Sequence, residues 1–334
     1  MSEFIPHVEI ALATYNGACF LPEQLASIAA QRWPDISVVA ADDGSTDTTL
    51  DILSTFKARP LRVVADTGGR GVRDNFAFAL GATVAPYVFL SDQDDWWEAD
   101  KVSAMMAKML EIEGVHGAAH PTLITCDLAI VDRNLQPTGG NWFAVTSKSA
   151  DAHSLADLVL TGHVPGCAMA VNRALLEMAL PIPTDVYIHD WWITLLAAAF
   201  GTIGHVDRPL IRYRQHGSNT LGAATAMSSP FTKLRAMLKA PLSGLRYQRA
   251  FYADQARIAN GNLAALQGVV RHSTSGHVPA PVQNLLNVLA HGGWWRRYRA
   301  LHGAQTGASG IAKAAITWHM RRSRGTGPTM PNTP

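Results

Sequence analysis

The chain has 334 residues, of which 48% are hydrophobic and 16% are charged, and its formal net charge is only +2. This composition is typical of a globular protein large enough for one domain with an appendage, or for two domains. So small a net charge argues against nucleic-acid binding as a main role. The cysteines Cys19, Cys126 and Cys167 match no zinc or redox spacing, so we expect reduced thiols.

Export and membrane signals are also missing from the sequence pattern. The N-terminal residues lack a basic stretch followed by an apolar one, which argues against a signal peptide. The longest uncharged apolar run, residues 191–206, is too short for a membrane span and contains Gly201 and Gly204. We interpret this run as a buried helix and expect a cytoplasmic protein.

In the first hundred residues, expected strands alternate with expected helices. The strands are short runs of β-branched and aliphatic residues, and the helices carry apolar residues at helical spacing. This alternation predicts βαβ units and a parallel sheet. The expected strands are residues 8–13, 36–41, 61–65 and 88–91, and the expected helices lie around residues 21–28, 50–53 and 75–80.

Polar residues follow successive strands of this pattern. Thr14, Tyr15 and Asn16 come after the first strand, and Asp42 and Asp43 come after the second. Ligands of an open α/β sheet bind beyond the carboxyl ends of its strands. Each group on its own is compatible with turn chemistry, but the recurrence at strand ends indicates a binding edge.

At that edge, a nucleotide has candidate partners. Asp43 could accept the imide N–H of a pyrimidine base, and Arg70 or Arg73 could face a diphosphate. No Gly-x-Gly-x-x-Gly or Walker pattern supports this assignment, so it depends on the strand-end positions alone.

The strand at residues 88–91 leads into three carboxylates, Asp92, Asp94 and Asp95. Like charges this close repel one another and are costly to desolvate. Hard cations such as Mg²⁺ or Mn²⁺ prefer carboxylate oxygens and would neutralise the cluster. The alternative is a solvated acidic turn in which Asp95 caps the following helix.

These motifs together resemble glycosyltransferase family 2. The resemblance lies in residues 8–16, in 42–47 (Asp-Asp-Gly-Ser-Thr-Asp) and in 90–95 (Leu-Ser-Asp-Gln-Asp-Asp). It implies the GT-A fold, an α/β architecture with a mostly parallel central sheet flanked by helices, here with a helical C-terminal extension. It also implies transfer with inversion at the sugar. We expect a catalytic domain over residues 1–225, with a nucleotide-binding half (1–100) and an acceptor half (101–225).

The resemblance also implies roles for residues of the first half. Thr14, Tyr15, Asn16 and Asp43 would bind the nucleoside. Asp92 and Asp94 would form the Asp-x-Asp pair that meets the ribose and a metal bridging the diphosphate. Three neighbouring acids offer two registers for this pair, and the sequence leaves both open.

Two later segments resemble the acceptor side of the family. Gly166 and Cys167 lie in a stretch that would shape the acceptor pocket, although a bent strand explains it equally well. His189-Asp190 stands where the family more often has Glu-Asp, so we expect Asp190 to be the general base and His189 to tune or orient it. Trp191 and Trp192 would stack on a sugar ring, or would belong to the core. Asp190 could instead cap a helix.

A further segment, residues 213–216 (Tyr-Arg-Gln-His), resembles the part of the family that closes over the donor diphosphate. By this resemblance His216 would complete the metal shell, and Arg212 or Arg214 would neutralise phosphate.

The last hundred residues interleave basic and aromatic side chains on amphipathic patterns. They could contact an anionic membrane surface, which would make the protein peripheral on the inner face of the cytoplasmic membrane. They could instead pack on the catalytic domain, which base rates favour, and nucleic-acid binding is the least supported role. We expect a helical region over 226–324 and a disordered tail over 325–334. The oligomeric state is not predicted.

The resulting hypothesis is an inverting glycosyltransferase that uses Mg²⁺ or Mn²⁺. The donor would be a dTDP- or UDP-linked sugar, and the acceptor a glycan or polyprenyl-linked glycan of bacterial surface polysaccharide, as in rhamnosyltransferases. The alternatives are a sugar nucleotidyltransferase, which has a similar sheet, and a non-catalytic sugar-nucleotide-binding scaffold.

Overall fold

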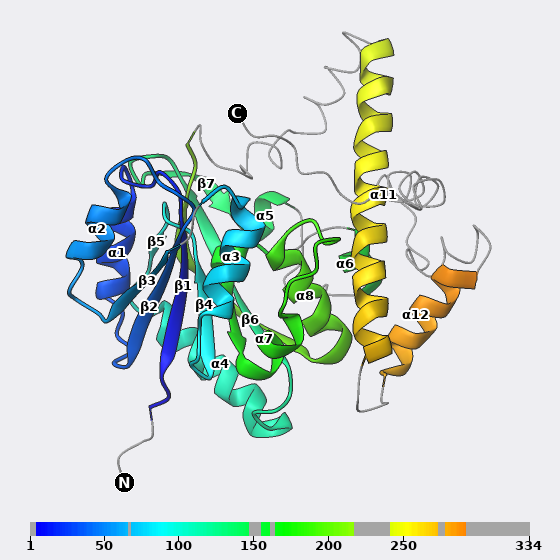
Figure 1. Ribbon diagram of the computed structural model, residues 1–334, viewed down its shortest axis with the longest axis horizontal. Helices are drawn as coiled ribbons and strands as arrows, with labels where there is room; N and C mark the ends of the chain where they lie inside the picture. Colours follow the sequence, from blue (N-terminus) through cyan, green and yellow to red (C-terminus); the bar gives the residue numbers. More distant parts are fainter. Residues whose placement is uncertain are drawn as a thin grey trace.

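The computed structural model describes residues 5–65, 68–146, 155–160, 164–216, 241–272 and 278–291. Within these ranges the chain forms a nine-stranded sheet with helices on both sides (Figure 1). The strand order is β3-β2-β1-β4-β8-β6-β9-β5, and β7 pairs with β6. The expectations for residues 226–240, for the basic clusters near 294–299 and 319–324, and for the tail at 325–334 lie outside the described residues.

The first half of the sheet is parallel, as expected. β1 (Val8–Thr14) pairs with β2 (Ile36–Asp42) and β4 (Tyr87–Ser91), and β2 pairs with β3 (Leu61–Ala65). All five residues of β4 are buried, because helices cover this sheet on both faces. The connecting helices are α1 (Leu21–Ala29), α2 (Thr49–Thr55) and α3 (Gly71–Gly81).

The second half of the sheet is mixed. β8 (Met169–Asn172) lies antiparallel between β4 and β6 (Thr122–Val131), and β9 (Thr202–Arg214) runs parallel to β6. β5 (Trp96–Trp97) pairs antiparallel with β9. This pairing matters for the site, because it holds the acidic loop between β4 and β5 against the end of β9. The remaining elements here are α4 (Lys101–His116), β7 (Pro137–Asn141), α5 (Trp142–Thr146), α6 (Leu155–Leu160), the 3-10 turn η1 (Gly166–Ala168) and α7 (Arg173–Ala179).

The predicted helix over residues 191–206 is wrong in its second part. α8 spans His189–Phe200, and the chain enters β9 at Thr202. Gly201 lies at the junction, where a Cβ atom would come within 1.9 Å of the carbonyl oxygen of Pro121. The backbone therefore passes too close to its neighbour for any side chain, and the close approach separates the two elements.

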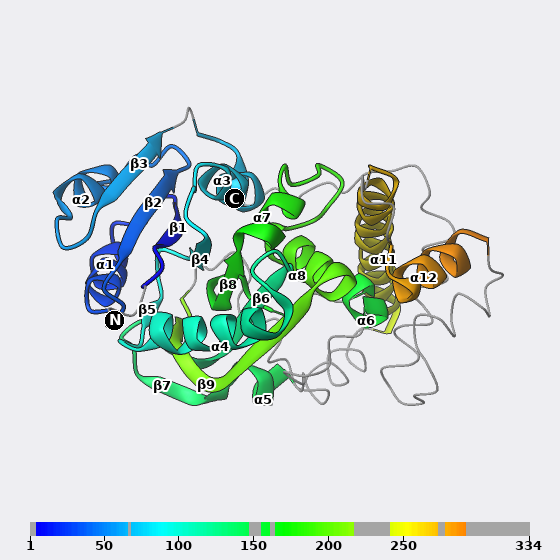
Figure 2. The same cartoon turned by 90° about the horizontal axis from the view of Figure 1, so that it is seen from below.

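The C-terminal helices pack on the rest of the structure. α11 (Pro241–His272) lies beside α6, and α12 (Ala280–His291) lies beside the lower end of α11 (Figures 1 and 2). Ile258 of α11 joins Ile188 and Trp191 in a small hydrophobic cluster. Buried side chains from both helices also continue the main core. The described part of this region therefore packs against residues of the second half of the sheet domain. The expected domain boundaries stay a prediction.

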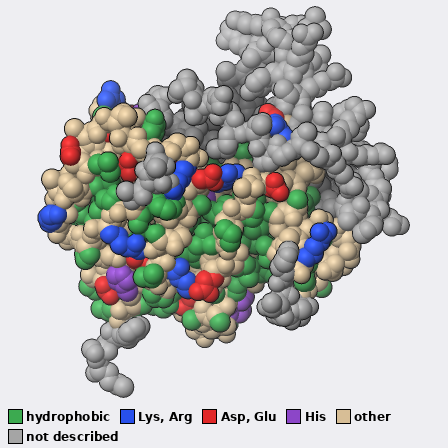
Figure 3. Space-filling view, viewed as in Figure 1, with side chains coloured by type: hydrophobic (Ala, Val, Ile, Leu, Met, Phe, Trp, Pro, Cys, Tyr) green, Lys and Arg blue, Asp and Glu red, His purple; other side chains and the backbone are tan. Residues whose placement is uncertain are grey.

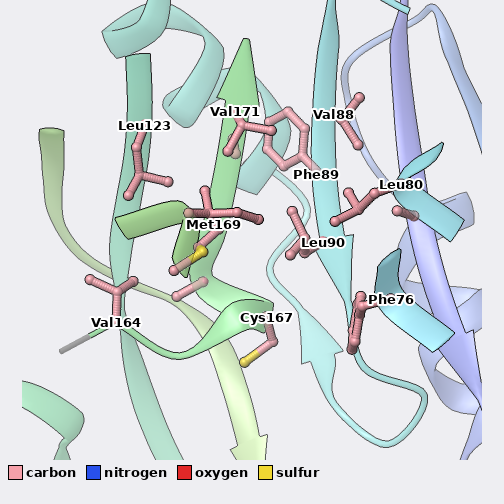
Figure 4. Close-up of a cluster of buried hydrophobic side chains, with 14 of the residues drawn as sticks. Phe76, Leu80, Val88, Phe89, Leu90, Leu123, Val164, Cys167, Met169 and Val171 are labelled. Atoms are coloured by element: carbon pink, nitrogen blue, oxygen red, sulfur yellow. The ribbon is translucent and has the colours of Figure 1, made fainter. Parts of the chain in front are cut away.

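The main core lies between the sheet and its helices. Figure 4 shows part of it, with Phe89 and Leu90 of β4 facing Met169 and Val171 of β8. On the surface, charged side chains of both signs are scattered among apolar and polar ones on the face drawn in Figure 3, in keeping with the small net charge. Among the described residues, no helix is both long and apolar enough to cross a membrane.

Candidate active site

The acidic loop after β4 meets the end of β9. The Oδ2 atom of Asp94 lies 2.8 Å from Nε2 of His216, 122 residues later in the chain. Arg214 fixes the same loop, because its Nε atom donates to the carbonyl oxygen of Asp94 at 2.8 Å and its backbone N–H donates to Asp95 at 3.2 Å. The fold thus brings together the predicted metal ligands Asp94 and His216.

The alternative of a solvated acidic turn is wrong. Asp95 has no exposed surface, and α4 begins at Lys101 with Asp100 at its N-cap position, so Asp95 caps no helix. One carboxylate oxygen of Asp95 is buried without a hydrogen-bond partner among the described residues. Such an atom is costly unless something compensates for its lost hydration, and a cation is one such partner.

The electrostatics of the loop show that the acids form one group. Burial, together with the negative charges of Asp94 and then Asp190, raises the pKa of Asp92 to about 7. Burial and the charges of Asp94 and Asp92 likewise raise the pKa of Asp95 well above its usual range. Asp190 comes from α8, about a hundred residues after the loop. It accepts the N–H of Gly166, whose neighbour Cys167 has its sulfur within 4.8 Å of Asp92 and Asp95, so Asp190 lies near the acidic loop.

Asp190 is held in a defined position. Its Oδ2 atom accepts the backbone N–H of Gly166 at 3.1 Å, and its Oδ1 atom accepts the N–H of Trp191 at 2.6 Å. It lies in the first turn of α8, whereas the N-cap position belongs to Ile188, so the capping alternative does not describe it. A Cβ atom on Gly166 would lie 3.0 Å from Nε2 of His189, so a larger residue there would push against the helix start.

The expected role of His189 needs a correction. Its imidazole stacks on Phe76 with ring centroids 4.1 Å apart, and neither ring nitrogen has a hydrogen-bond partner among the described residues. Burial lowers the pKa of His189 to about 3, so the ring is neutral near pH 7. It therefore neither orients Asp190 through a hydrogen bond nor places a positive charge beside it.

The nucleoside-side residues surround the ends of β1 and β2. Thr14 is buried and its hydroxyl donates to Asp42 at 2.8 Å, whereas the Tyr15 side chain is 56% exposed. Asn16 has a φ of 45°, a left-handed conformation that asparagine tolerates, and its side-chain oxygen accepts the N–H of Thr46. Tyr15 is therefore the residue of this turn that is accessible for stacking.

Asp43 organises the start of α3. Its two carboxylate oxygens accept the backbone N–H groups of Arg70 at 2.8 Å and Gly71 at 2.9 Å. Each oxygen retains a lone pair, so the expected contact with a base stays compatible with this geometry. The guanidinium carbon of Arg70 lies 3.9 Å from the ring centroid of Phe78, and Arg70 is partly exposed.

Two arginines expected to face phosphate are engaged elsewhere. Arg73 binds Asp74 through Nε and Nη2 and donates to the carbonyl oxygens of Thr184 and Val186 at 2.9 and 3.0 Å. Arg214 is 1% exposed and pairs with Glu23 at 2.5 Å. Arg73 thereby holds the loop before α8, and Arg214 holds the acidic loop. In these positions both guanidinium groups bind protein atoms and stabilise the loops of the site.

Three residues expected to contact the acceptor are buried. Trp191 and Trp192 are 6% and 1% exposed, and their indole N–H groups donate to the carbonyl oxygens of Leu158 and Ala179. Cys167 has no exposed surface and lies at the edge of the core cluster in Figure 4. The two tryptophans therefore belong to the core, which was the alternative to sugar stacking. The sulfur of Cys167 lies within 4.8 Å of candidate ligand atoms of Asp92 and Asp95. Gly166 is buried as well and serves Asp190 through its N–H.

Sequence reasoning missed two residues of the site. Gln93 bonds the turn after β1, and Lys101 lies buried beneath the acids. The position of Gln93 between the acids was visible in the sequence, but its partner was not. Nothing in the sequence distinguishes Lys101 from a solvated lysine at the start of a helix.

A divalent cation fits this group of residues. Asp92, Asp94 and His216 provide oxygen and nitrogen atoms of the kind that Mg²⁺ and Mn²⁺ accept, and Asp95 contributes the unpartnered buried oxygen. A second set, Asp92, Asp95 and Cys167, has candidate ligand atoms within 4.8 Å of one another. Asp92 belongs to both sets, and among the described residues the second set is the one whose three ligand atoms lie this close together.

Fold and site together define an α/β enzyme that gathers carboxylates at the carboxyl edge of its sheet. Residues 9–174 match the family model described as Glycosyl transferase family 2. The chain is 30% identical over 243 residues to an uncharacterised glycosyltransferase of Nostoc, covering 69% of this chain and 71% of that protein. The chain therefore belongs to glycosyltransferase family 2, and it is a glycosyltransferase. This membership favours the transferase over the nucleotidyltransferase alternative.

Other similarities refine the comparison. The dTDP-rhamnosyl transferase RfbG of Shigella flexneri is 29% identical over 248 residues, covering 67% of this chain and 78% of RfbG. Among solved structures, S. aureus TarS in complex with UDP-GlcNAc superposes with a TM-score of 0.53 at 16% identity, covering 95% of this chain and 92% of that one. The mannosyltransferase PcManGT of Pyrobaculum calidifontis, in complex with GDP-Man and Mn²⁺, gives 0.52 at 19% identity, covering 96% and 85%. The expected GT-A fold is confirmed.

Proposed function

We propose that this enzyme transfers a sugar from a nucleoside-diphosphate donor to a glycan hydroxyl by a single inverting displacement that depends on Mg²⁺ or Mn²⁺. The observation that carries the proposal is the position of Asp190 relative to the acidic loop. Asp190 accepts the backbone N–H of Gly166, and the sulfur of the next residue, Cys167, lies within 4.8 Å of candidate ligand atoms of Asp92 and Asp95. An inverting transfer needs both, a group that takes the acceptor proton and a group that stabilises the departing diphosphate.

On the donor side, Asp94, Asp92 and His216 would hold the cation, since the Asp94–His216 pair is the more accessible register, with side chains 16% and 12% exposed. When bound, the cation supplies Lewis-acid stabilisation of negative charge on the diphosphate. Arg214 and Glu23 keep the carboxylate loop in place. Tyr15 and Asp43 would meet the nucleoside, and Arg70 is the remaining arginine for the diphosphate.

On the acceptor side, Asp190 would take the proton of the attacking hydroxyl. The N–H groups of Gly166 and Trp191 donate to its two carboxylate oxygens and hold the carboxylate in one orientation. A neutral His189 beside it adds no charge to this step. As the hydroxyl bonds to the anomeric carbon, its proton moves to Asp190 and the diphosphate oxygen leaves from the opposite face.

The similarity to RfbG, whose name specifies a dTDP-rhamnosyl donor, supports a dTDP- or UDP-linked sugar. It also supports a glycan or polyprenyl-linked glycan of bacterial surface polysaccharide as acceptor. A putative teichuronic acid biosynthesis glycosyltransferase, TuaG of Bacillus subtilis, is 29% identical over 115 residues and supports the same substrate class.

Asp190→Asn tests the proposal. The variant keeps the size of the side chain but removes a base, so transfer should fall by at least about a thousandfold. Binding of a sugar nucleotide, measured by calorimetry with Mn²⁺, should stay within a few-fold of wild type. Asp185→Asn is the matched control, because Asp185 is exposed on the loop before α8 and should retain full activity. An active Asp190→Asn enzyme would remove Asp190 from the mechanism.

A further inference from the structure

Lys101 is a buried charge to which the mechanism assigns no role. It is the first residue of α4, it has no exposed surface, and it is the one lysine counted as buried among the described residues. Moving an ammonium group out of water is strongly unfavourable unless the surrounding residues compensate for it. The residues around Lys101 must therefore compensate for the loss of hydration of its ammonium group.

The direct contacts of Lys101 are neutral. Its Nζ atom donates to the carbonyl oxygen of Cys167 at 2.8 Å and lies 3.2 Å from the ring centroid of Trp97. A carbonyl and an aromatic face both favour a cation, but neither carries a full negative charge. These contacts position the ammonium group without neutralising it.

Carboxylates of the acidic loop lie on the other side of Cys167 from Lys101. Cys167, whose carbonyl binds Lys101, presents its sulfur to Asp92 and Asp95, with the three candidate ligand atoms within 4.8 Å of one another. Burial lowers the pKa of Lys101 to about 8, while the cysteine thiols and then the carboxylates of Asp95 and Asp92 act in the opposite direction. The same cation lowers the pKa of Asp92 against burial and the like charges around it.

We propose that Lys101 is a positioning residue of the metal site. It is a fixed internal cation that offsets the charge of Asp92 and Asp95, and it thereby limits how tightly these acids and their neighbours bind a divalent cation. The inference rests on the proposed function, in which that cation holds the donor diphosphate. Lys101 and the metal attract the same carboxylates and repel each other, so the lysine weakens metal binding. It also holds the acids together when no metal is bound, between release of one diphosphate and arrival of the next donor.

The test uses two neutral variants of the full chain, Lys101→Met and Lys101→Gln. Methionine keeps an unbranched side chain one atom shorter than lysine, and glutamine of the same length also keeps an N–H donor directed toward the carbonyl oxygen of Cys167. Lys108→Met is the matched control, because Lys108 lies on the same helix and forms a partly exposed pair with Glu111. Affinity for Mn²⁺ alone is measured from free-ion electron paramagnetic resonance, and melting temperature is measured in EDTA and over a Mn²⁺ titration.

Both Lys101 variants should bind Mn²⁺ more tightly than wild type, on the order of tenfold, because one repelling charge is removed. They should also melt at a lower temperature in EDTA and gain more from Mn²⁺ than wild type does. A variant that unfolds in EDTA should refold as Mn²⁺ is added. The Lys108→Met protein should match wild type in each measurement.

The outcomes distinguish the inference from the function beneath it. If the wild type binds Mn²⁺ and both Lys101 variants bind it equally or more weakly, the proposed role of Lys101 is overturned. The proposed metal site would be unaffected by that result. A change confined to Lys101→Met also overturns it, because the hydrogen bond to Cys167 would then be what matters. A wild-type protein that binds no Mn²⁺ overturns the metal dependence and this inference together.

Discussion

The side chain of Gln93 forms two hydrogen bonds with the backbone of Tyr15. Its Oε1 atom accepts the N–H of Tyr15 at 2.9 Å, and its Nε2 atom donates to the carbonyl oxygen of the same residue at 2.9 Å. The amide thus joins the turn after β1 to the acidic loop after β4. Gly17 makes room for it, since a Cβ atom there would lie 2.1 Å from Gln93 Oε1. These two hydrogen bonds therefore connect the turn proposed to bind the nucleoside with the loop proposed to bind the metal.

Gln93→Ala should weaken binding of UDP or dTDP in the presence of Mn²⁺. Loss of two hydrogen bonds, each contributing about 1 kcal/mol, predicts a decrease in affinity of roughly tenfold to thirtyfold. Calorimetry measures this directly. Gln136→Ala, at an exposed position, is the control and should bind like wild type. Equal affinities in the two variants would show that the link does not position the turn.

His216→Ala should reduce the effect of Mn²⁺ on the protein. Without Nε2 of His216, the cation loses one ligand and Asp94 loses its 2.8 Å partner. We expect transfer to need at least about tenfold more Mn²⁺ and the Mn²⁺-induced rise in melting temperature to shrink. His7 forms a similar pair with Asp35 at 2.8 Å away from the site, so His7→Ala should leave the Mn²⁺ response intact.

His189 should make the stability of the protein sensitive to acid. Burial holds its folded-state pKa at about 3, below the value near 6.5 of an unfolded histidine. Between these values the unfolded state binds the extra proton, so stability rises with pH and is lost as pH falls below about 6.5.

His189→Phe keeps an aromatic ring against Phe76 and removes the titration. From pH 7.5 to pH 5 the wild type should lose about 2 kcal/mol more unfolding free energy than the variant. Urea unfolding of both proteins at the two pH values measures the difference. Equal losses would mean that the imidazole already reaches water or a hydrogen-bond partner in the folded state.

Gly261→Ala should impair the chemical step through the loop that leads to Asp190. A Cβ atom at Gly261 of α11 would lie 2.1 Å from the carbonyl oxygen of Asp185, so the helix or the loop must move. The loop is also bound by Arg73 at Val186, which leaves it little freedom. We expect the maximal transfer rate to fall about tenfold or more, with little change in donor affinity.

Gly268→Ala is the matched control for that change. A Cβ atom at Gly268 on the same helix would meet nothing within 4 Å. Alanine is the better helix former by about 1 kcal/mol, so this variant should be fully active and slightly more stable. If both glycine variants behave alike in kinetic assays, α11 does not position the loop.

The nucleotide-binding half was predictable in some detail. The strand expected at residues 61–65 matches β3, and the expected first and second strands differ from β1 and β2 by one residue each. β1 and β2 are buried on both faces, so their continuous β-branched and aliphatic runs are a local signal. The apolar run at 191–206 misled for the same reason, because apolarity alone does not separate a buried helix from a buried strand.

The short antiparallel strand β8 of the second half was not foreseen. β8 has four residues and pairs with β4 and β6, both far away along the chain. A strand this short carries too little periodicity to be recognised, and its direction depends on partners that only the folded chain brings together.

For the site, the sequence specified the chemistry and its place along the chain: acids after β4, an aspartate at the start of α8, and a histidine after β9. The tertiary structure sets what each group does. It buries Asp95 and Lys101, pairs Asp94 with His216, turns Arg73 and Arg214 toward supporting contacts, and places Trp192 in the core. Burial and charge depend on neighbours that are distant in sequence, and a local pattern contains no information about them.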